Sequence, residues 1–288
     1  MIHRSTRLVS GLLVAALLTA GVSFVRAQAS GPMTPPASRA AAPPPAVSKP
    51  ETPPMPPEEM IRRIAQKEDA MVRAMAGYSF QQSMQIQEIG EDGKPTGQVE
   101  IVSSQFPGPD GKRYQKIIRR AASTLRFIQV ERGDLDGFSL APMFPLVTAQ
   151  LPKYQISFEG KQPLDELSVF VFAVKPRSLD RTRAYFSGTV WVDEQDFVIV
   201  KTIGKWVTET GDVTPPQFPF TVYETYRQQV GKDLWMPAYS RSDSALPVGR
   251  SSVPIRMVIR WSDYAPYTGA PPVAPPAAAN PPDKPGTP

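Results

Sequence analysis

The clearest pattern in the chain is a short-range alternation of apolar and polar residues that recurs from residue 80 to residue 261. It is most regular at 185–193, and it resumes after the polar turn 193–196. Two such segments joined by a short turn predict an antiparallel hairpin. Apolar side chains occur on both faces, so we expect a central hairpin with packing on each side. In its second strand the alternation predicts one shared face for Phe197, Ile199, Lys201 and Ile203.

Further segments of this kind predict a mainly β domain with an antiparallel sheet. Gly, Pro and Asp turns separate most of the strands, so we expect a meander of about ten or eleven strands. The predicted strands outside the hairpin are 80–87, 98–104, 113–120, 124–130, 154–158, 167–174, 218–229, 234–244 and 253–261.

One amphipathic helix precedes these strands. Two prolines and two glutamates at 56–59 suit a helix N-terminus. Apolar residues, several of them Met, follow at helical spacing up to Met75, and Gly77 predicts a left-handed C-cap. The Met-rich stripe is typical of core packing against a sheet, and alternatively of an adaptable lid over an apolar ligand.

Residues 131–152 interrupt the strand pattern, because this apolar segment contains prolines. Such a sequence forms neither a good strand nor a long helix. Two interpretations remain open. A short helix or loop could lie over the concave face of the sheet, or a loop could fill a hole in the core.

The ends of the chain differ from this domain in composition. Arg4 and Arg7 precede an uncharged, mostly apolar stretch at 8–25, and small residues follow, with candidate cleavage sites after Ala27 and Ala29. This pattern predicts a cleaved signal peptide at 1–29 and a periplasmic or secreted protein, the alternative being an uncleaved N-terminal anchor. Residues 30–56 and 268–288 are Pro- and Ala-rich, which predicts disordered, extended spacers around one domain at 57–267.

Composition excludes several classes of chemistry. The only histidine, His3, lies in the signal segment, and the chain has no cysteine. This removes Ser-His-Asp and Cys-His catalysis, the usual zinc sites and disulfides. Acidic pairs such as Asp193 and Glu194 fall in predicted turns, where Asp is common for structural reasons. We therefore expect no enzyme, no cofactor and no metal site.

The charge pattern gives little reason to expect a nucleic-acid partner. Three of the 32 basic residues lie in the signal segment, which contains no acidic residue. The rest of the chain therefore has 29 basic and 27 acidic residues and is nearly balanced in charge. One basic cluster, at 112–120, could meet anionic lipid head groups or phosphates. Strand alternation would divide its charges between two faces, which favours a solvated edge strand instead.

The hairpin sequence resembles the LolA-like superfamily of periplasmic lipoprotein-sorting carriers and related exported bacterial proteins. The resemblance rests on YFSGTVWVD at 185–193 followed by DFVIVKT at 196–202, with FAVKPR at 172–177 and Trp235-Met236-Pro237 as weaker parts. It implies an incomplete antiparallel β-barrel covered by helix, around an apolar cavity that holds acyl chains. No cargo-binding position is carried over.

These patterns together predict an exported, non-enzymatic and monomeric envelope protein that binds a lipid or acylated protein in an apolar concavity. The alternative is an envelope interaction or sensor module with a filled core, binding a protein partner or the cell wall. The candidate lining residues, which core packing would explain equally well, are Met84, Ile86, Phe138, Met143, Phe144, Trp191 and Phe197.

Overall fold

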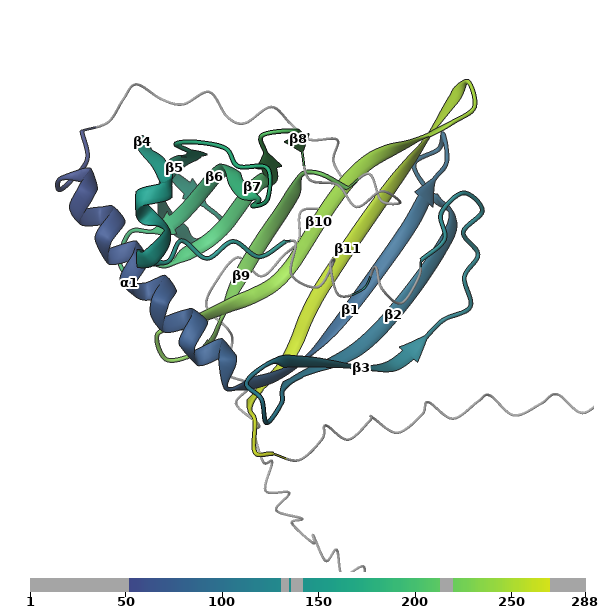
Figure 1. Cartoon of the computed structure of the whole chain (residues 1–288), viewed down its shortest axis with the longest axis horizontal. Helices are drawn as coiled ribbons and strands as arrows, with labels where there is room; N and C mark the ends of the chain where they lie inside the picture. The colour runs from purple at the N-terminus through teal and green to yellow at the C-terminus, as the bar shows by residue number, and fades with distance from the viewer. Residues whose placement is uncertain (1–51, 131–134, 136–141, 213–219, 270–288) are drawn as a thin grey trace, which may run out of the picture.

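The computed structural model describes residues 52–130, 135, 142–212 and 220–269. One helix, α1 (Pro57–Ala76), lies against an 11-stranded antiparallel sheet (Figure 1). A short 3-10 helix, η1 (Thr148–Lys153), precedes β4. The strands are β1 (Tyr78–Ile89), β2 (Pro95–Pro107), β3 (Arg113–Arg120), β4 (Tyr154–Leu164), β5 (Leu167–Pro176), β6 (Tyr185–Asp193), β7 (Ile199–Thr208), β8 (Gly211–Asp212), β9 (Tyr223–Gly231), β10 (Leu234–Val248) and β11 (Ser251–Pro266).

The sheet consists of two meanders joined by its first and last strands. The strand order is β3-β2-β1-β11-β10-β9-β7-β6-β5-β4, with β8 paired to β7. The junction is the β1–β11 pairing, in which Met84 lies opposite Ile259. The sheet curls, and α1 crosses its concave side (Figure 1). The predicted fold class, a mainly β incomplete antiparallel barrel with a flanking helix, is confirmed.

Helix α1 begins for local reasons, but its end depends on a contact with a distant segment. Pro57 occupies its first turn, and Glu58 and Glu59 lie where the helix dipole favours acids. The predicted left-handed C-cap is wrong, since Gly77 has φ −97°. The chain enters β1 directly at Tyr78, and the Gly77 carbonyl accepts a hydrogen bond from the Tyr267 amide at 2.8 Å. A left-handed residue would turn the chain away from this pairing.

No helix in the described part is long and apolar enough to cross a membrane.

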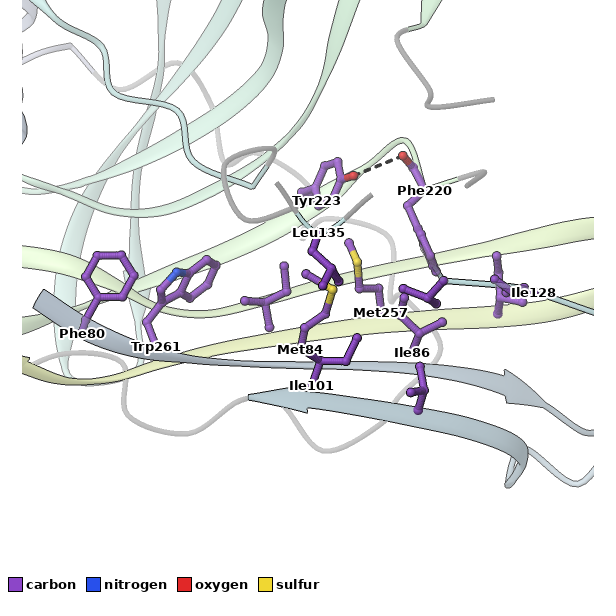
Figure 2. Packing of buried hydrophobic residues seen from close by; sticks show 14 residues of the cluster. Phe80, Met84, Ile86, Ile101, Ile128, Leu135, Phe220, Tyr223, Met257 and Trp261 are labelled. Atoms are coloured by element: carbon purple, nitrogen blue, oxygen red, sulfur yellow. Dashed lines mark hydrogen bonds between the residues drawn. The ribbon is translucent and has the colours of Figure 1, made fainter. Parts of the chain in front are cut away.

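The apolar core divides into clusters along the curled sheet. On the concave side of β1, β2 and β11, Met84, Ile86 and Met257 pack beneath Leu135 (Figure 2). The Tyr223 hydroxyl donates a 3.3 Å hydrogen bond to the Phe220 carbonyl above them. A second cluster joins the N-terminal half of α1 to β4–β7, and a third contains Trp191, Val198, Val200 and Trp235.

The β6–β7 hairpin is central and packed on both faces, as predicted, but its second strand is irregular. Phe197 has φ 56° and belongs to the turn, where the Asp193 carboxylate accepts the amides of Gln195 and Asp196. Val192 then pairs with Ile199, whereas Trp191 pairs with Lys201. This bulge puts Ile199 and Lys201 on opposite faces, so the predicted shared face is wrong.

The predicted strand at 124–130 does not form. The carboxylate of Glu88, buried at the end of β1, accepts the backbone N–H groups of Arg126, Phe127 and Ile128 at 2.7–3.3 Å. A buried carboxylate needs such partners, and these amides are therefore not available to a neighbouring strand. The segment lies across the ends of β1 and β2 instead.

Candidate ligand-binding pocket

A pocket of about 350 Å³ opens between helix and sheet. Its walls are the C-terminal half of α1, the β2–β3 turn, the concave face of the sheet, and residues 142–145, which we call the strap. The lining residues are Met71, Val72, Met75, Ala76, Pro107, Gly111, Lys112, Arg113, Pro142, Met143, Phe144, Pro145, Thr202, Thr225, Arg227 and Pro237.

Helix α1 uses its apolar stripe in two ways. Met60 and Ile64, in its first half, are buried in the core cluster of β4–β7. Met71, Val72 and Met75 line the pocket, and Val72 is 40% exposed. Flexible Met side chains adapt to apolar groups of different shape. Core packing is therefore confirmed for the first half of the helix, whereas the second half lines a pocket and its role as a lid over an apolar ligand remains a prediction.

The strap is held to the sheet through its backbone. The Thr225 hydroxyl donates to the Pro142 carbonyl at 2.9 Å, and the Arg227 guanidinium donates to the Phe144 carbonyl at 3.0 Å. The Phe144 ring stacks on Phe186 with 4.0 Å between centroids. These contacts fix the apolar side chains of the strap on the pocket wall. Within the strap, Phe144 lies both on the pocket wall and in the core cluster of β4–β7, whereas residues 131–134 and 136–141 of the predicted region lie outside the described residues.

A buried ion pair joins the helix to the sheet beside the pocket. The Arg227 guanidinium on β9 makes two hydrogen bonds to the Glu68 carboxylate on α1, at 2.6 and 2.9 Å. The two residues are 4% and 1% exposed. Because Arg227 is paired in this way, it adds a polar surface to the pocket without adding an uncompensated charge.

Arg113, at the start of β3, closes the pocket at the C-terminal end of α1. Its guanidinium donates to the Met75 and Tyr78 carbonyls at 2.5 and 3.1 Å, and lies 4.8 Å from the centre of the Phe80 ring. Burial lowers the pKa of Arg113 from its ordinary value. Cations are favourable at a helix C-terminus, so Arg113 stabilises this end of the helix.

The structure brings two of the seven predicted lining residues to this pocket, Met143 and Phe144. Met84 and Ile86 lie in the core cluster of Figure 2. Trp191 packs in the third cluster, and Phe197 borders a separate pocket between the chain before α1 and strands β4 and β5. Phe138 lies outside the described residues. A ligand-binding role for any of these residues remains a prediction.

Sequence reasoning missed much of the pocket wall. The signal for Met71 and Met75 was present in the Met-rich stripe, but the stripe alone could not separate pocket from core. Glu68 and Arg227 had no such signal, because they are 159 residues apart. The rim residues of the β2–β3 turn were likewise recognisable only as a turn.

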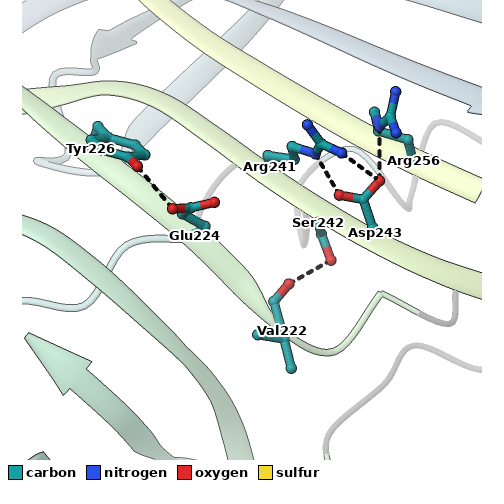
Figure 3. A network of polar contacts seen from close by, with 7 residues as sticks. All are labelled: Val222, Glu224, Tyr226, Arg241, Ser242, Asp243 and Arg256. Carbon is teal, nitrogen blue, oxygen red and sulfur yellow. Dashed lines mark hydrogen bonds and ion pairs between the residues drawn. The ribbon is translucent and has the colours of Figure 1, made fainter. Parts of the chain in front are cut away.

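Other polar clusters in the described residues are paired internally. On β9, β10 and β11, Asp243 accepts hydrogen bonds from Arg241 and Arg256, and the Tyr226 hydroxyl donates to Glu224 (Figure 3). Burial alone would raise the pKa of Asp243, but the two arginines outweigh it and hold the pKa below the ordinary value. In the residues that the structure describes, no group of three or more acidic residues, His or Cys could hold a metal ion. We assign these clusters a structural role.

Comparison with known proteins gives architectural likeness only. No model of a protein family and no curated protein matches this chain. Among solved structures, a DUF1329 family protein from Desulfovibrio piger is 12% identical, covering 73% of this chain and 95% of that one, with a TM-score of 0.35. An outer-membrane lipoprotein-sorting protein domain from Vibrio parahaemolyticus is 14% identical, covering 74% and 94%, with a TM-score of 0.36.

A LolA superfamily protein from Nitrosomonas europaea is 16% identical, covering 71% of this chain and 92% of that one, with a TM-score of 0.32. No ligand or partner is transferred to this chain from these structures. The proteins to which the chain is similar in structure thus include the LolA superfamily and the lipoprotein-sorting proteins that the hairpin sequence resembles.

Proposed function

We propose that this protein is a non-enzymatic envelope protein that binds the acyl chain of a lipid or acylated protein in the pocket between α1 and the sheet. The observation that carries the proposal is the pocket itself. Its volume of about 350 Å³ lies at the lower end of the range for ligand sites, roughly 300–1,000 Å³. One acyl chain, or part of one, suits this size.

The chemistry of the wall also favours an apolar ligand. Three methionines, four prolines, Val72 and Phe144 form most of it. Three of its polar groups, on Thr225, Arg227 and Arg113, already have hydrogen-bond partners in the protein. Burial of each methylene of a ligand would contribute about 0.8 kcal/mol. Affinity would then come from apolar contact.

The N-terminal sequence indicates where this binding would take place. Residues 1–29 have the pattern of a cleaved signal peptide, which would place the mature protein in the periplasm or outside the cell. The Pro-rich segments at either end would act as spacers around the domain at 57–267. We propose that the protein acts as a monomer, with an envelope lipid or acylated protein as its partner.

Titration of the mature protein, residues 30–288, with a fluorescent fatty acid tests this function. Val72→Asp places a carboxylate at the pocket mouth, on a side chain that is already 40% exposed. We expect the affinity to fall about tenfold, equivalent to about 1.4 kcal/mol, because a charge is unfavourable beside an acyl chain. Phe144 is less suitable, because it is 2% exposed and its replacement would disturb the core.

The matched control is Leu179→Asp, an exposed apolar residue outside the pocket with 45% exposure. This variant should bind the fatty acid as the wild type does. Native mass spectrometry of protein purified from the periplasm without detergent should also show an adduct of lipid mass. Wild-type protein that binds no fatty acid and carries no adduct would contradict the proposal and favour a module that binds a protein partner or the cell wall.

A further inference from the structure

Strand β3 forms one edge of the sheet and carries a concentration of basic residues. Among the strands that the structure describes, it pairs only with β2. Between residues 98 and 126 the chain has six basic residues and two acidic ones. Both acids are engaged, since Glu100 lies 2.9 Å from Arg119 and Asp110 lies 3.6 Å from Lys112. The edge therefore has a positive excess.

Strand alternation places the basic side chains of β3 on two faces of the sheet, but at an edge this does not keep them from acting together. Lys116 and Arg119 lie opposite Ser104 and Val102, whereas Arg120 lies opposite Ile101, which belongs to the concave core. Within a sheet, these two sets would meet different surroundings. At an edge, both sets lie beside one open side of the sheet, and Arg120 remains exposed there although its guanidinium also donates to the Val130 carbonyl at 2.6 Å. The edge position that the sequence predicts for this cluster is confirmed, and it allows charges on both faces of the strand to act together.

Exposed aromatic side chains flank this basic edge. Tyr114 on β3 is 45% exposed, and Phe127, in the segment after β3 that lies across the ends of β1 and β2, is 49% exposed. Basic residues that merely protect an edge from pairing would not require exposed apolar groups beside them. Aromatic and basic side chains together are typical of protein surfaces at the interface of a membrane.

We propose that the β3 edge, comprising residues 112–127, docks on the surface of a bilayer that contains anionic phospholipids. Lys and Arg side chains contact the head groups, and Tyr114 and Phe127 enter the interfacial layer. Lys112 and Arg113 belong both to this edge and to the pocket wall. Docking therefore places the pocket mouth beside the bilayer. Membrane docking goes beyond acyl binding and does not depend on it.

Co-sedimentation with lipid vesicles tests the docking surface. The mature protein should bind vesicles of phosphatidylcholine mixed with phosphatidylglycerol, and should not bind vesicles of phosphatidylcholine alone. Binding should weaken as salt is added, because salt screens exposed charges. Lys116→Glu combined with Arg126→Glu should lower the partition coefficient by ~25-fold or more, since each basic residue near an anionic surface contributes about fivefold. Neither residue lines the pocket.

The matched control is Lys153→Glu combined with Arg177→Glu. These exposed residues adjoin at the far end of the sheet, where the Arg177 amide donates to the Lys153 carbonyl at 2.8 Å. The variant makes the same change in net charge and should bind anionic vesicles as the wild type does. Equal loss in both variants would mean that only total charge matters and would overturn the proposal.

Further measurements distinguish docking on an anionic bilayer from fatty-acid binding in the pocket and from recognition of free phosphate. The Lys116→Glu/Arg126→Glu variant should still bind the fluorescent fatty acid in solution, which separates failure of docking from failure of the pocket. Phe127→Ser should weaken the binding that remains at high salt. Equal binding of wild type to neutral vesicles, or displacement from anionic vesicles by millimolar inorganic phosphate, would show that no anionic bilayer surface is recognised as such.

Discussion

At the scale of single residues, Glu68 and Arg227 determine how helix α1 is attached to the sheet. Both charges are removed from water, which is costly for each of them alone. The pair is tolerated because it makes two short hydrogen bonds and because Arg227 also binds the Phe144 carbonyl. One side chain of β9 thus fixes both the helix and the strap that form the pocket.

Glu68→Gln should strongly destabilise the protein. The substitution leaves the guanidinium of Arg227 buried without a counter-charge, and we expect the free energy of unfolding to fall by about 3–5 kcal/mol. Urea unfolding followed by circular dichroism measures this change.

The double variant Glu68→Met/Arg227→Met serves as the control for this prediction. It removes both charges and keeps side chains of similar length, so it should be more stable than Glu68→Gln alone. A Glu68→Gln protein within about 1 kcal/mol of wild type would show that water reaches Arg227.

At the scale of elements, the β6–β7 hairpin depends on a pair of glycines. Gly188 lies opposite Gly204, and the ring of Phe186 packs over both. The lack of two Cβ atoms makes room for this ring, which in turn stacks on Phe144 of the strap. The hairpin is therefore also the support for one wall of the pocket.

Gly204→Ala should destabilise the hairpin. A Cβ at this position would lie 2.3 Å from Cζ of Phe186 and 2.7 Å from the Ser187 carbonyl oxygen. We expect a loss of about 1–3 kcal/mol in the free energy of unfolding, because the core must shift to relieve the overlap. Displacement of Phe186 should also weaken fatty-acid binding.

Gly231→Ala provides the comparison, since nothing lies within 4 Å of a Cβ added at the end of β9. Its unfolding midpoint in urea should match that of the wild type. Equal stability of both alanine variants would mean that Phe186 can move without cost and that the glycine pair is not required.

At the scale of the whole molecule, the pairing of β1 with β11 joins the two meanders into one sheet. The hydrogen bond from the Tyr267 amide to the Gly77 carbonyl follows at the end of this pairing. The first strand thus lies between β2 and the last strand, so the two ends of the domain are neighbours. The strands and the strap that line the pocket lie between these two ends, and α1, its other wall, directly precedes β1.

A chain of residues 52–269 should therefore fold on its own. Every described strand pairing lies within 78–266, so we expect the same urea midpoint and the same dependence on urea as for residues 30–288. Fatty-acid affinity should also be unchanged. A lower midpoint for the shorter chain would show that the Pro-rich segments contribute to the folded domain and are more than spacers.

The sequence by itself determined the helix, most strands and the β6–β7 turn, because burial periods of 3.6 and 2 residues and turn chemistry are local properties. The strand at 124–130 failed because the buried carboxylate of Glu88, on another strand, takes its amides. The hairpin bulge and the entry from α1 into β1 likewise depend on partners outside the local pattern.

Only the tertiary structure decided which strands are neighbours, which half of the Met stripe is core, and where the pocket lies. Each depends on contacts between distant residues, such as Glu68 with Arg227 or β1 with β11. The alternation of apolar and polar residues indicates on which side of its own strand a side chain lies. It does not indicate which other element packs against that side, and a pocket requires both of its walls.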